Sequence, residues 1–141
     1  MKTIIIAIFI FTTITSVIAQ GDLNVTVTGI ENTKGTIRIA LFNNESGFPT
    51  DETKAFKLVA IRITGESVNT IFKNLPYGKY AIAAFHDENN NSIFDTNFIG
   101  IPKEGNGVTK GTGKSLSTPN YSDATFQFTE SSTNINIRLF Y

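Results

Sequence analysis

The sequence predicts an all-β protein, a seven-stranded antiparallel β-sandwich with a long loop after its fifth strand. Three observations predict this class. Apolar and polar residues alternate in several short segments, glycines and prolines fall between these segments, and no segment sustains a helical period. The 12 Phe residues supply bulk for a core without polar atoms that would need partners.

The seven expected strands are residues 23–28, 36–41, 54–63, 68–72, 80–85, 124–128 and 135–139. The first two show the clearest alternation of period two. In the third, the apolar phase slips between Leu58 and Val59, which suggests a β-bulge. The fifth strand is rich in alanine, so we expect another layer to approach it closely. From Asp87 to Asn120 there is little periodicity, and loops of that length tend to be functional.

A Leu-Pro-x-Gly-x-Tyr run ends at Tyr80, just before the fifth strand. Such a run resembles the tyrosine corner of β-sandwiches, in which the Tyr hydroxyl bonds to the upstream backbone. A plain Pro-Gly turn followed by an aromatic strand residue explains the same pattern. Both interpretations stay open on the sequence.

Residues 1–19 have the layout of a secretory signal peptide. Lys2 supplies a positive charge, residues 4–14 are almost wholly apolar, and small or β-branched residues precede a cut after Ala19. The apolar run is short for a membrane span, although an uncleaved anchor is the alternative. We therefore expect residues 20–141 to be one exported domain, periplasmic or secreted, without a membrane span after cleavage.

Composition excludes several functions. Lys and Arg balance Asp and Glu at 12 each, which gives no electrostatic footprint for nucleic acid. There is no Cys, and hence no disulfide, thiolate nucleophile or Cys-based metal site. No nucleophile motif accompanies the single His, so we expect no enzyme, and a hydrolase is only a distant third possibility.

The chemically pointed stretch lies directly after the fifth strand. Side-chain oxygens fall at positions one, three, five and nine of a possible cation loop, and a backbone carbonyl falls at position seven. Calcium favours six to eight such oxygens. The predicted metal ligands are Asp87, Asn89, Asn91, Ile93 and Asp95, with calcium as the candidate cofactor.

Other features of this stretch favour an ion-free alternative. Ser92 and Phe98 stand where an EF-hand loop has Gly and Glu, so the stretch is not an EF-hand. Glu104 could supply a further carboxylate. Asp and Asn side chains also bond their own backbone in turns that hold no ion. A lone His, here His86, is more often a hydrogen-bonding residue than a metal ligand.

Five motifs in order resemble one known family. They are Gly-x-Ile-x-Ile-Ala-Leu-Phe at 35–42, Leu-Pro-x-Gly-x-Tyr-Ala at 75–81, His-Asp-x-Asn-x-Asn at 86–91, Ile-Gly-Ile-Pro-x-Glu-Gly-x-Gly at 99–107 and Ala-x-Phe at 124–126. This pattern resembles the DUF2141 family, small exported bacterial domains of unknown function, over residues 22–141. The resemblance implies a transthyretin-like or Ig-like sandwich and brings no catalytic residue set.

The sequence departs from that family at one turn. Relatives tend to have Gly-Asn-Gly after His-Asp-Glu-Asn, whereas this chain has Asn90, Asn91 and Ser92. Asn enters the left-handed conformation readily and Ser less so. The departure therefore weakens the prediction of a cation loop.

These observations predict a binding or accessory module of the cell envelope, acting as a monomer. Its ligand is an unknown protein or glycan, and residues 87–107 are the expected working surface, with calcium as the ion that would order them. The alternative is a structural module of a surface assembly that pairs through its edge strands.

Overall fold

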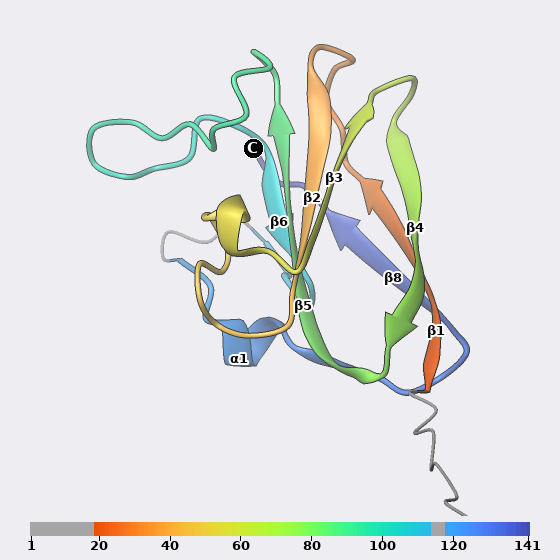
Figure 1. Ribbon diagram of the computed structural model, residues 1–141. Coiled ribbons are helices and arrows are strands. Elements are labelled where there is room, and N and C mark those ends of the chain that lie inside the picture. The colour runs from red at the N-terminus through yellow and green to blue at the C-terminus, as the bar shows by residue number, and fades with distance from the viewer. Residues whose placement is uncertain (1–18, 114–117) are drawn as a thin grey trace, which may run out of the picture.

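The computed structural model describes residues 19–113 and 118–141. Within them the regular secondary structure is nearly all strand, arranged in two facing sheets (Figure 1). The strands are β1 (Gln20–Thr28), β2 (Thr36–Phe42), β3 (Lys57–Arg62), β4 (Ser67–Pro76), β5 (Gly78–Asp87), β6 (Asn106–Val108), β7 (Phe126–Phe128) and β8 (Ser132–Arg138), and the helices are the 3₁₀ turn η1 (Glu52–Lys54) and α1 (Tyr121–Ala124). The predicted all-β sandwich is therefore confirmed as a class.

The strand order gives one sheet β4-β1-β8 and a second sheet β3-β2-β5-β6, with β7 also paired to β5. Every pair is antiparallel except β1 with β8, which run parallel. The prediction of a wholly antiparallel sandwich was wrong at that pair. Alternation along a strand reports which face is buried, and it carries no information about the direction of the neighbouring strand.

The predicted count of seven strands was also wrong, because β6 makes eight among the described residues. This strand is only three residues long and shows no alternation. It pairs with β5, and Asn106 and Phe140 exchange two backbone hydrogen bonds of 3.0 Å. These bonds connect the two sheets along one side. The backbones approach closely there, because a Cβ on Gly107 would overlap the carbonyl oxygen of Arg138.

The core lies between the sheets. Alternate residues of β1 and β2 point into it, as their sequence pattern predicts. Its largest side chains with almost no exposure are Phe128, Leu23, Ile37, Ile39, Leu41, Leu75, Ile82 and Ile137. Burial of each large apolar side chain contributes about 1.5–3 kcal/mol, and that burial holds the two sheets together.

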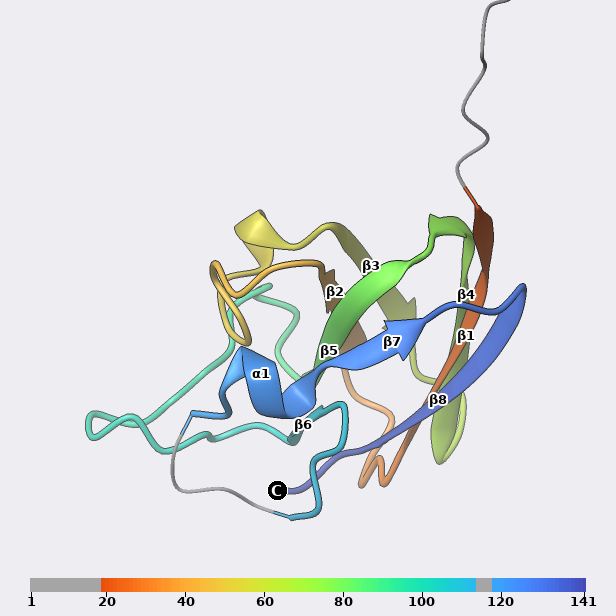
Figure 2. The same cartoon turned by 90° about the horizontal axis from the view of Figure 1, so that it is seen from below.

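A second apolar cluster covers the opposite, outward face of β2 and β5. Ala40, Phe42 and Ala83 are buried there against Phe48 and Tyr121. Figure 2 shows α1 beside β5, on the side away from the three-stranded sheet. Ala83 of β5 therefore lies under a closely packed layer, as the sequence predicted for this strand.

The β-bulge predicted in the third strand is not present in β3. β3 pairs with β2 in unbroken register from Lys57 to Arg62. The first residues of the predicted strand, 54–56, lie instead in η1 and in the loop that follows it. The register shift is instead in β1, between Gly21 and Leu23. The exposed Leu58 accounts for the phase slip, because it lies on the outward face of an edge strand.

Tyr80 forms the predicted corner. Its hydroxyl donates a 2.8 Å hydrogen bond to the carbonyl oxygen of Pro76, and its side chain is 4% exposed. Burial raises the pKa of this phenol, so it remains a donor. The corner fixes the turn from β4 into β5 and so the direction in which β5 leaves for the segment after Asp87.

Replacing Tyr80 with phenylalanine is expected to lower the free energy of unfolding by about 1 kcal/mol, because the carbonyl of Pro76 then loses its partner. Chemical denaturation monitored by circular dichroism measures the change. The matched variant is Tyr77→Phe, which removes a hydroxyl from a residue that is 36% exposed and is expected to change little. Equal effects of the two substitutions would contradict this role for Tyr80.

Residues 1–18, which hold nearly all of the predicted signal peptide, lie outside the described residues. β1 begins at Gln20, the first residue of the predicted mature domain. None of the helices within residues 19–113 and 118–141 is long and apolar enough to cross a membrane.

Candidate functional site

The segment after β5 begins with a buried carboxylate. Asp87 is 1% exposed and ends the strand. One of its oxygens accepts the backbone N–H of Asn91 at 3.0 Å, and the other accepts the N–H of Ser92 at 2.9 Å. The acidic side chain thus folds the following five residues back onto the end of β5.

Two asparagines and a second carboxylate continue this turn. Asn89 Oδ1 and Asn91 Oδ1 accept backbone N–H groups two residues further on, which makes each an Asx turn. Their amide Nδ2 atoms both donate to Oδ2 of Asp95, at 2.7 and 3.1 Å. The three side chains therefore meet at one point.

Ser92 has a left-handed backbone, with φ 61°, a conformation that serine adopts less readily than glycine. Its hydroxyl accepts a 3.0 Å hydrogen bond from Arg38 Nη1. The same guanidinium donates from Nε and Nη2 to Glu52. A serine at this position thus contributes a contact that glycine lacks, and Arg38 of β2 ties together residues 43–56 and residues 87–104.

Glu104 joins the two ends of the segment. Its carboxylate accepts the backbone N–H of Glu88 at 3.3 Å and that of Asp95 at 3.0 Å. Burial raises the pKa of this carboxyl group, and the charges of Asp95 and Asp87 raise it further, against the lowering effect of the two N–H donors. From the sequence, Glu104 was a possible metal ligand. In the structure its carboxylate binds two backbone N–H groups.

The raised pKa of Glu104 predicts a pH dependence of stability. The folded state holds the proton more tightly than the unfolded state, so this contribution is fully present below the ordinary value of 4.5 and is lost as pH rises through the folded pKa. We expect the free energy of unfolding to fall more steeply between pH 4.5 and neutrality in the natural protein than in Glu104→Gln. Urea denaturation across this range measures both slopes, and parallel profiles would contradict the assignment.

The predicted metal ligands are thus only partly brought together. Asn89, Asn91 and Asp95 converge, whereas the Asp87 carboxylate is directed at backbone N–H groups. The fifth predicted ligand, the backbone carbonyl of Ile93, stays a prediction. No group of three or more His, Cys, Asp or Glu side chains within the described residues is arranged to hold a metal ion. The hydrogen bonds match the Asx-turn alternative, and calcium binding stays a prediction.

His86 is fully buried beside this segment. Its Nε2 lies 2.6 Å from the carbonyl oxygen of Lys34, so it must carry a proton, and its Nδ1 lies 2.7 Å from the hydroxyl of Tyr141. Tyr141 also accepts the backbone N–H of Glu31 at 3.3 Å. The expected hydrogen-bonding role for the lone His fits this geometry, because both ring nitrogens face protein partners.

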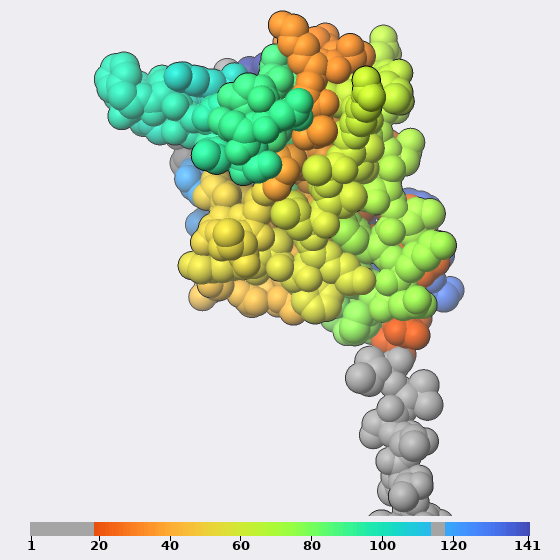
Figure 3. Space-filling model, turned by 45° about the horizontal axis from the view of Figure 1, so that its top comes forward, coloured from red at the N-terminus to blue at the C-terminus, as the bar shows by residue number. Residues whose placement is uncertain are grey.

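The far end of the segment is a projecting turn. A bridge between Thr96 and Pro102 closes it, and Phe98 at its apex is 98% exposed. In Figure 3 the residues that follow Asp95 stand out from the body of the protein. We call residues 96–102 the tip.

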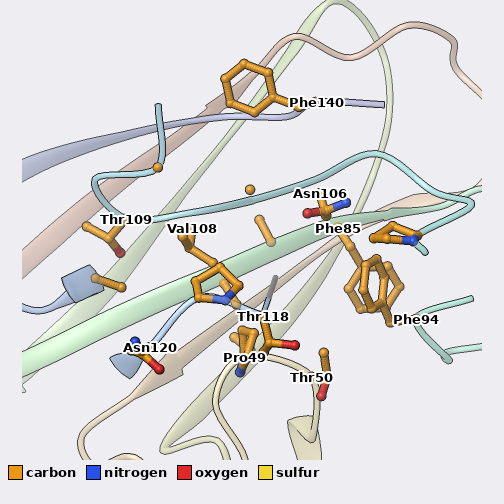
Figure 4. A pocket seen from close by; sticks show the side chains of 18 of the residues that line it. Pro49, Thr50, Phe85, Phe94, Asn106, Val108, Thr109, Thr118, Asn120 and Phe140 are labelled. Carbon is orange, nitrogen blue, oxygen red and sulfur yellow. The ribbon is translucent and has the colours of Figure 1, made fainter. Parts of the chain in front are cut away.

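A groove of about 790 Å³ lies over the outward face of β5 and β6, and we call it the outer groove (Figure 4). Phe85 and Phe94, whose ring centroids are 5.3 Å apart, lie together at one end of it. Threonine and asparagine side chains lie along the walls beside these rings. The lining residues labelled in Figure 4 are Pro49, Thr50, Phe85, Phe94, Asn106, Val108, Thr109, Thr118, Asn120 and Phe140.

Charge in the outer groove is sparse and mixed. Among the described residues its charged lining consists of Lys110, Asp123 and Glu52, and Glu52 is already paired with Arg38. The sequence did not predict the outer groove as a whole, because several separate segments form it. Part of its lining, from Phe94 to Gly107, falls within residues 87–107, the expected working surface. Its only signal was the stretch of poor periodicity from Asp87 to Asn120.

A family model for uncharacterized proteins conserved in bacteria, DUF2141, matches residues 25–136. The chain belongs to the DUF2141 family. The match reaches from β1 into β8, and it includes the whole segment from Asp87 to Glu104. No curated protein and no solved structure matches the chain.

Proposed function

We propose that this DUF2141 member is an exported binding or accessory module of the cell envelope, and that the outer groove holds its ligand. The observation that carries the proposal is the groove itself, a concave site on a rigid sheet whose walls are loops. Ligand sites favour such places, because the scaffold holds the loops while their side chains vary. Arg38 supports this role, since it anchors two of the segments that form the walls.

The lining favours a neutral glycan over an ionic ligand. The half-buried ring of Phe94, which packs on the buried Phe85, can pack on the C–H face of a sugar ring. The side chains of Thr50, Asn106 and Asn120 offer hydrogen-bonding groups for its hydroxyls. Of the described lining, Lys110 and Asp123 remain outside the Arg38–Glu52 pair, and their opposite charges give no net attraction for a charged group. A short glycan of the envelope is therefore the proposed ligand class.

The test is to block access to the outer groove with a bulky side chain at its exposed edge. Thr50→Trp places an indole at the exposed edge of the groove, and Thr64→Trp adds the same group in the exposed turn between β3 and β4. Neutral oligosaccharides released from bacterial envelopes serve as the probe in isothermal titration calorimetry. Binding that survives in Thr64→Trp and is lost in Thr50→Trp supports the proposal, and equal binding by both variants would refute it.

Calcium binding by residues 87–95 is a separate proposal. An ion that binds only the folded state must raise the melting midpoint, by an amount that grows with its concentration. We expect millimolar calcium to raise the midpoint, as suits an extracellular site with few carboxylates, and a chelator to reverse the rise. The Asp87→Ala, Asp95→Ala double variant should lose this response, and an absent response in the natural protein would end the calcium proposal.

The structural alternative has support at the other side of the sandwich. Within the described residues β3 pairs only with β2, and β4 pairs only with β1, so each has a free edge. Leu58 and Ile71 are exposed on these strands, at 43% and 51%. If the chain assembles through these edges, its sedimentation coefficient must rise with concentration, and Ala60→Lys on β3 must suppress the rise.

A further inference from the structure

The tip has an apolar apex with no cover in the described chain. Phe98 and Ile99 are adjacent at the turn and are 98% and 64% exposed. Leu58 and Ile71 are exposed on the flat face of a strand, whereas the two apex residues project on a turn that stands out from the body (Figure 3). Exposed apolar groups that project in this way mark an interaction site.

The backbone of the tip is largely satisfied from within. Asn97 Oδ1 accepts the N–H groups of Ile99 and Ile101, at 3.0 and 2.9 Å. The N–H of Gly100 donates to the carbonyl of Asn97, and the N–H of Asn97 donates to the carbonyl of Ile101. Most N–H groups of the apex therefore need no water molecule, which lowers the free-energy cost of moving the turn into a medium of low polarity.

Charge around the tip is arranged in two zones. Residues 96–102 contain no charged side chain. The exposed Lys103 follows directly at the base, while Asp95 and Glu104 direct their carboxylates inward to asparagine amides and backbone N–H groups. The uncharged apex can therefore enter the interface of a bilayer, while Lys103 and the inward-directed carboxylates at the base stay in water.

We propose that the tip is a membrane-contact site, which inserts Phe98 and Ile99 into the interface of a phospholipid bilayer. A bilayer accepts a convex apex without any matching pocket, whereas a protein partner would have to supply one. Insertion of two side chains anchors the protein weakly and reversibly, and it would hold the adjacent outer groove close to the membrane surface. Insertion of the tip does not depend on a ligand in the outer groove.

The test uses the fact that the chain contains no tryptophan. Phe98→Trp places a single fluorophore at the apex, and Ile71→Trp places one at a 51% exposed site on β4 as the matched control. Both proteins are titrated with vesicles of phosphatidylethanolamine and phosphatidylglycerol. We expect the emission of the Phe98→Trp variant to shift to shorter wavelength as lipid is added, and that of the control to stay constant.

A second measurement avoids the added indole. In vesicle sedimentation, Phe98→Ser is expected to lower the partition coefficient about tenfold relative to Ile71→Ser. The proposal is overturned if lipid does not shift the emission of Phe98→Trp and Phe98→Ser partitions like the natural protein. It is overturned as well if the Ile71 controls change by the same amounts. It is also overturned if the emission shift at position 98 follows protein concentration in the absence of vesicles, because a second copy of the chain would then cover the tip.

Discussion

Gly35→Ala is expected to lower the free energy of unfolding by about 2–5 kcal/mol. Gly35 has a φ of +66°, a left-handed conformation that costs an alanine energy. A Cβ at this position would also overlap the carbonyl oxygen of Asp87. Relief of that overlap requires the end of β5 to move away from the start of β2, at the place where the segment 87–104 begins.

The matched control is Gly65→Ala in the turn between β3 and β4. A Cβ added at Gly65 would have no other atom within 4 Å, and the backbone there has no left-handed φ. We expect this variant to unfold within about 0.5 kcal/mol of the natural protein. Urea denaturation of both variants gives the comparison, and a similar loss in both would mean that the contact between Gly35 and Asp87 is not a constraint.

Asp87→Ala is expected to cost about 2–4 kcal/mol, because the backbone N–H groups of Asn91 and Ser92 lose a buried charged acceptor. Asp87→Asn keeps one acceptor oxygen and is expected to lose less. Asp123→Ala removes an exposed carboxylate on α1 and is expected to change the free energy by less than about 0.5 kcal/mol.

Hydrogen exchange locates the effect of Asp87→Ala. We expect exchange to accelerate most at the amides of residues 88–95, and to accelerate in β1, which belongs to the other sheet, by no more than the loss of global stability requires. If Asp87→Ala is as stable as Asp123→Ala, the carboxylate does not organise the segment. The outcome bears directly on whether residues 87–104 form a fixed wall beside the outer groove.

Much of the fold could be predicted from the sequence, because strands of a sandwich bury alternate residues. Leu23 and Ile37 carry that signal plainly in β1 and β2, and both are fully buried. The corner at Tyr80 was one of two interpretations of its proline, glycine and tyrosine spacing, and the hydrogen bond from its hydroxyl to the carbonyl of Pro76 decides between them. These features are local, and their physical cause lies within a few residues of the pattern that reports them.

Features that depend on distant segments could not be predicted in the same way. β6 exists because Asn106 meets Phe140, far along the chain, and its three residues have no pattern of their own. The parallel pairing of β1 with β8 likewise depends on how the chain crosses between sheets. The outer groove combines both problems, because it needs the layer over β5 and the path of β6 at once.

The acidic stretch shows a third limit. Spacing predicted which oxygens could lie near one another, and Asn89, Asn91 and Asp95 do converge. Spacing could not predict the direction of the Asp87 carboxylate, because that depends on which backbone N–H groups the turn leaves free. The contact of Ser92 with Arg38 could not be predicted either, because Arg38 lies in β2, far from Ser92 in the sequence.

The most direct test of the proposed function is a nuclear magnetic resonance titration of the isotope-labelled domain with neutral envelope oligosaccharides. If the outer groove is the ligand site, the backbone amide signals of Thr50, Asn106 and Thr109 shift with a common saturation curve. Signals from β4 stay in place. Shifts confined to the free edges of β3 and β4, or no shift in the outer groove with any oligosaccharide, would contradict the proposed function.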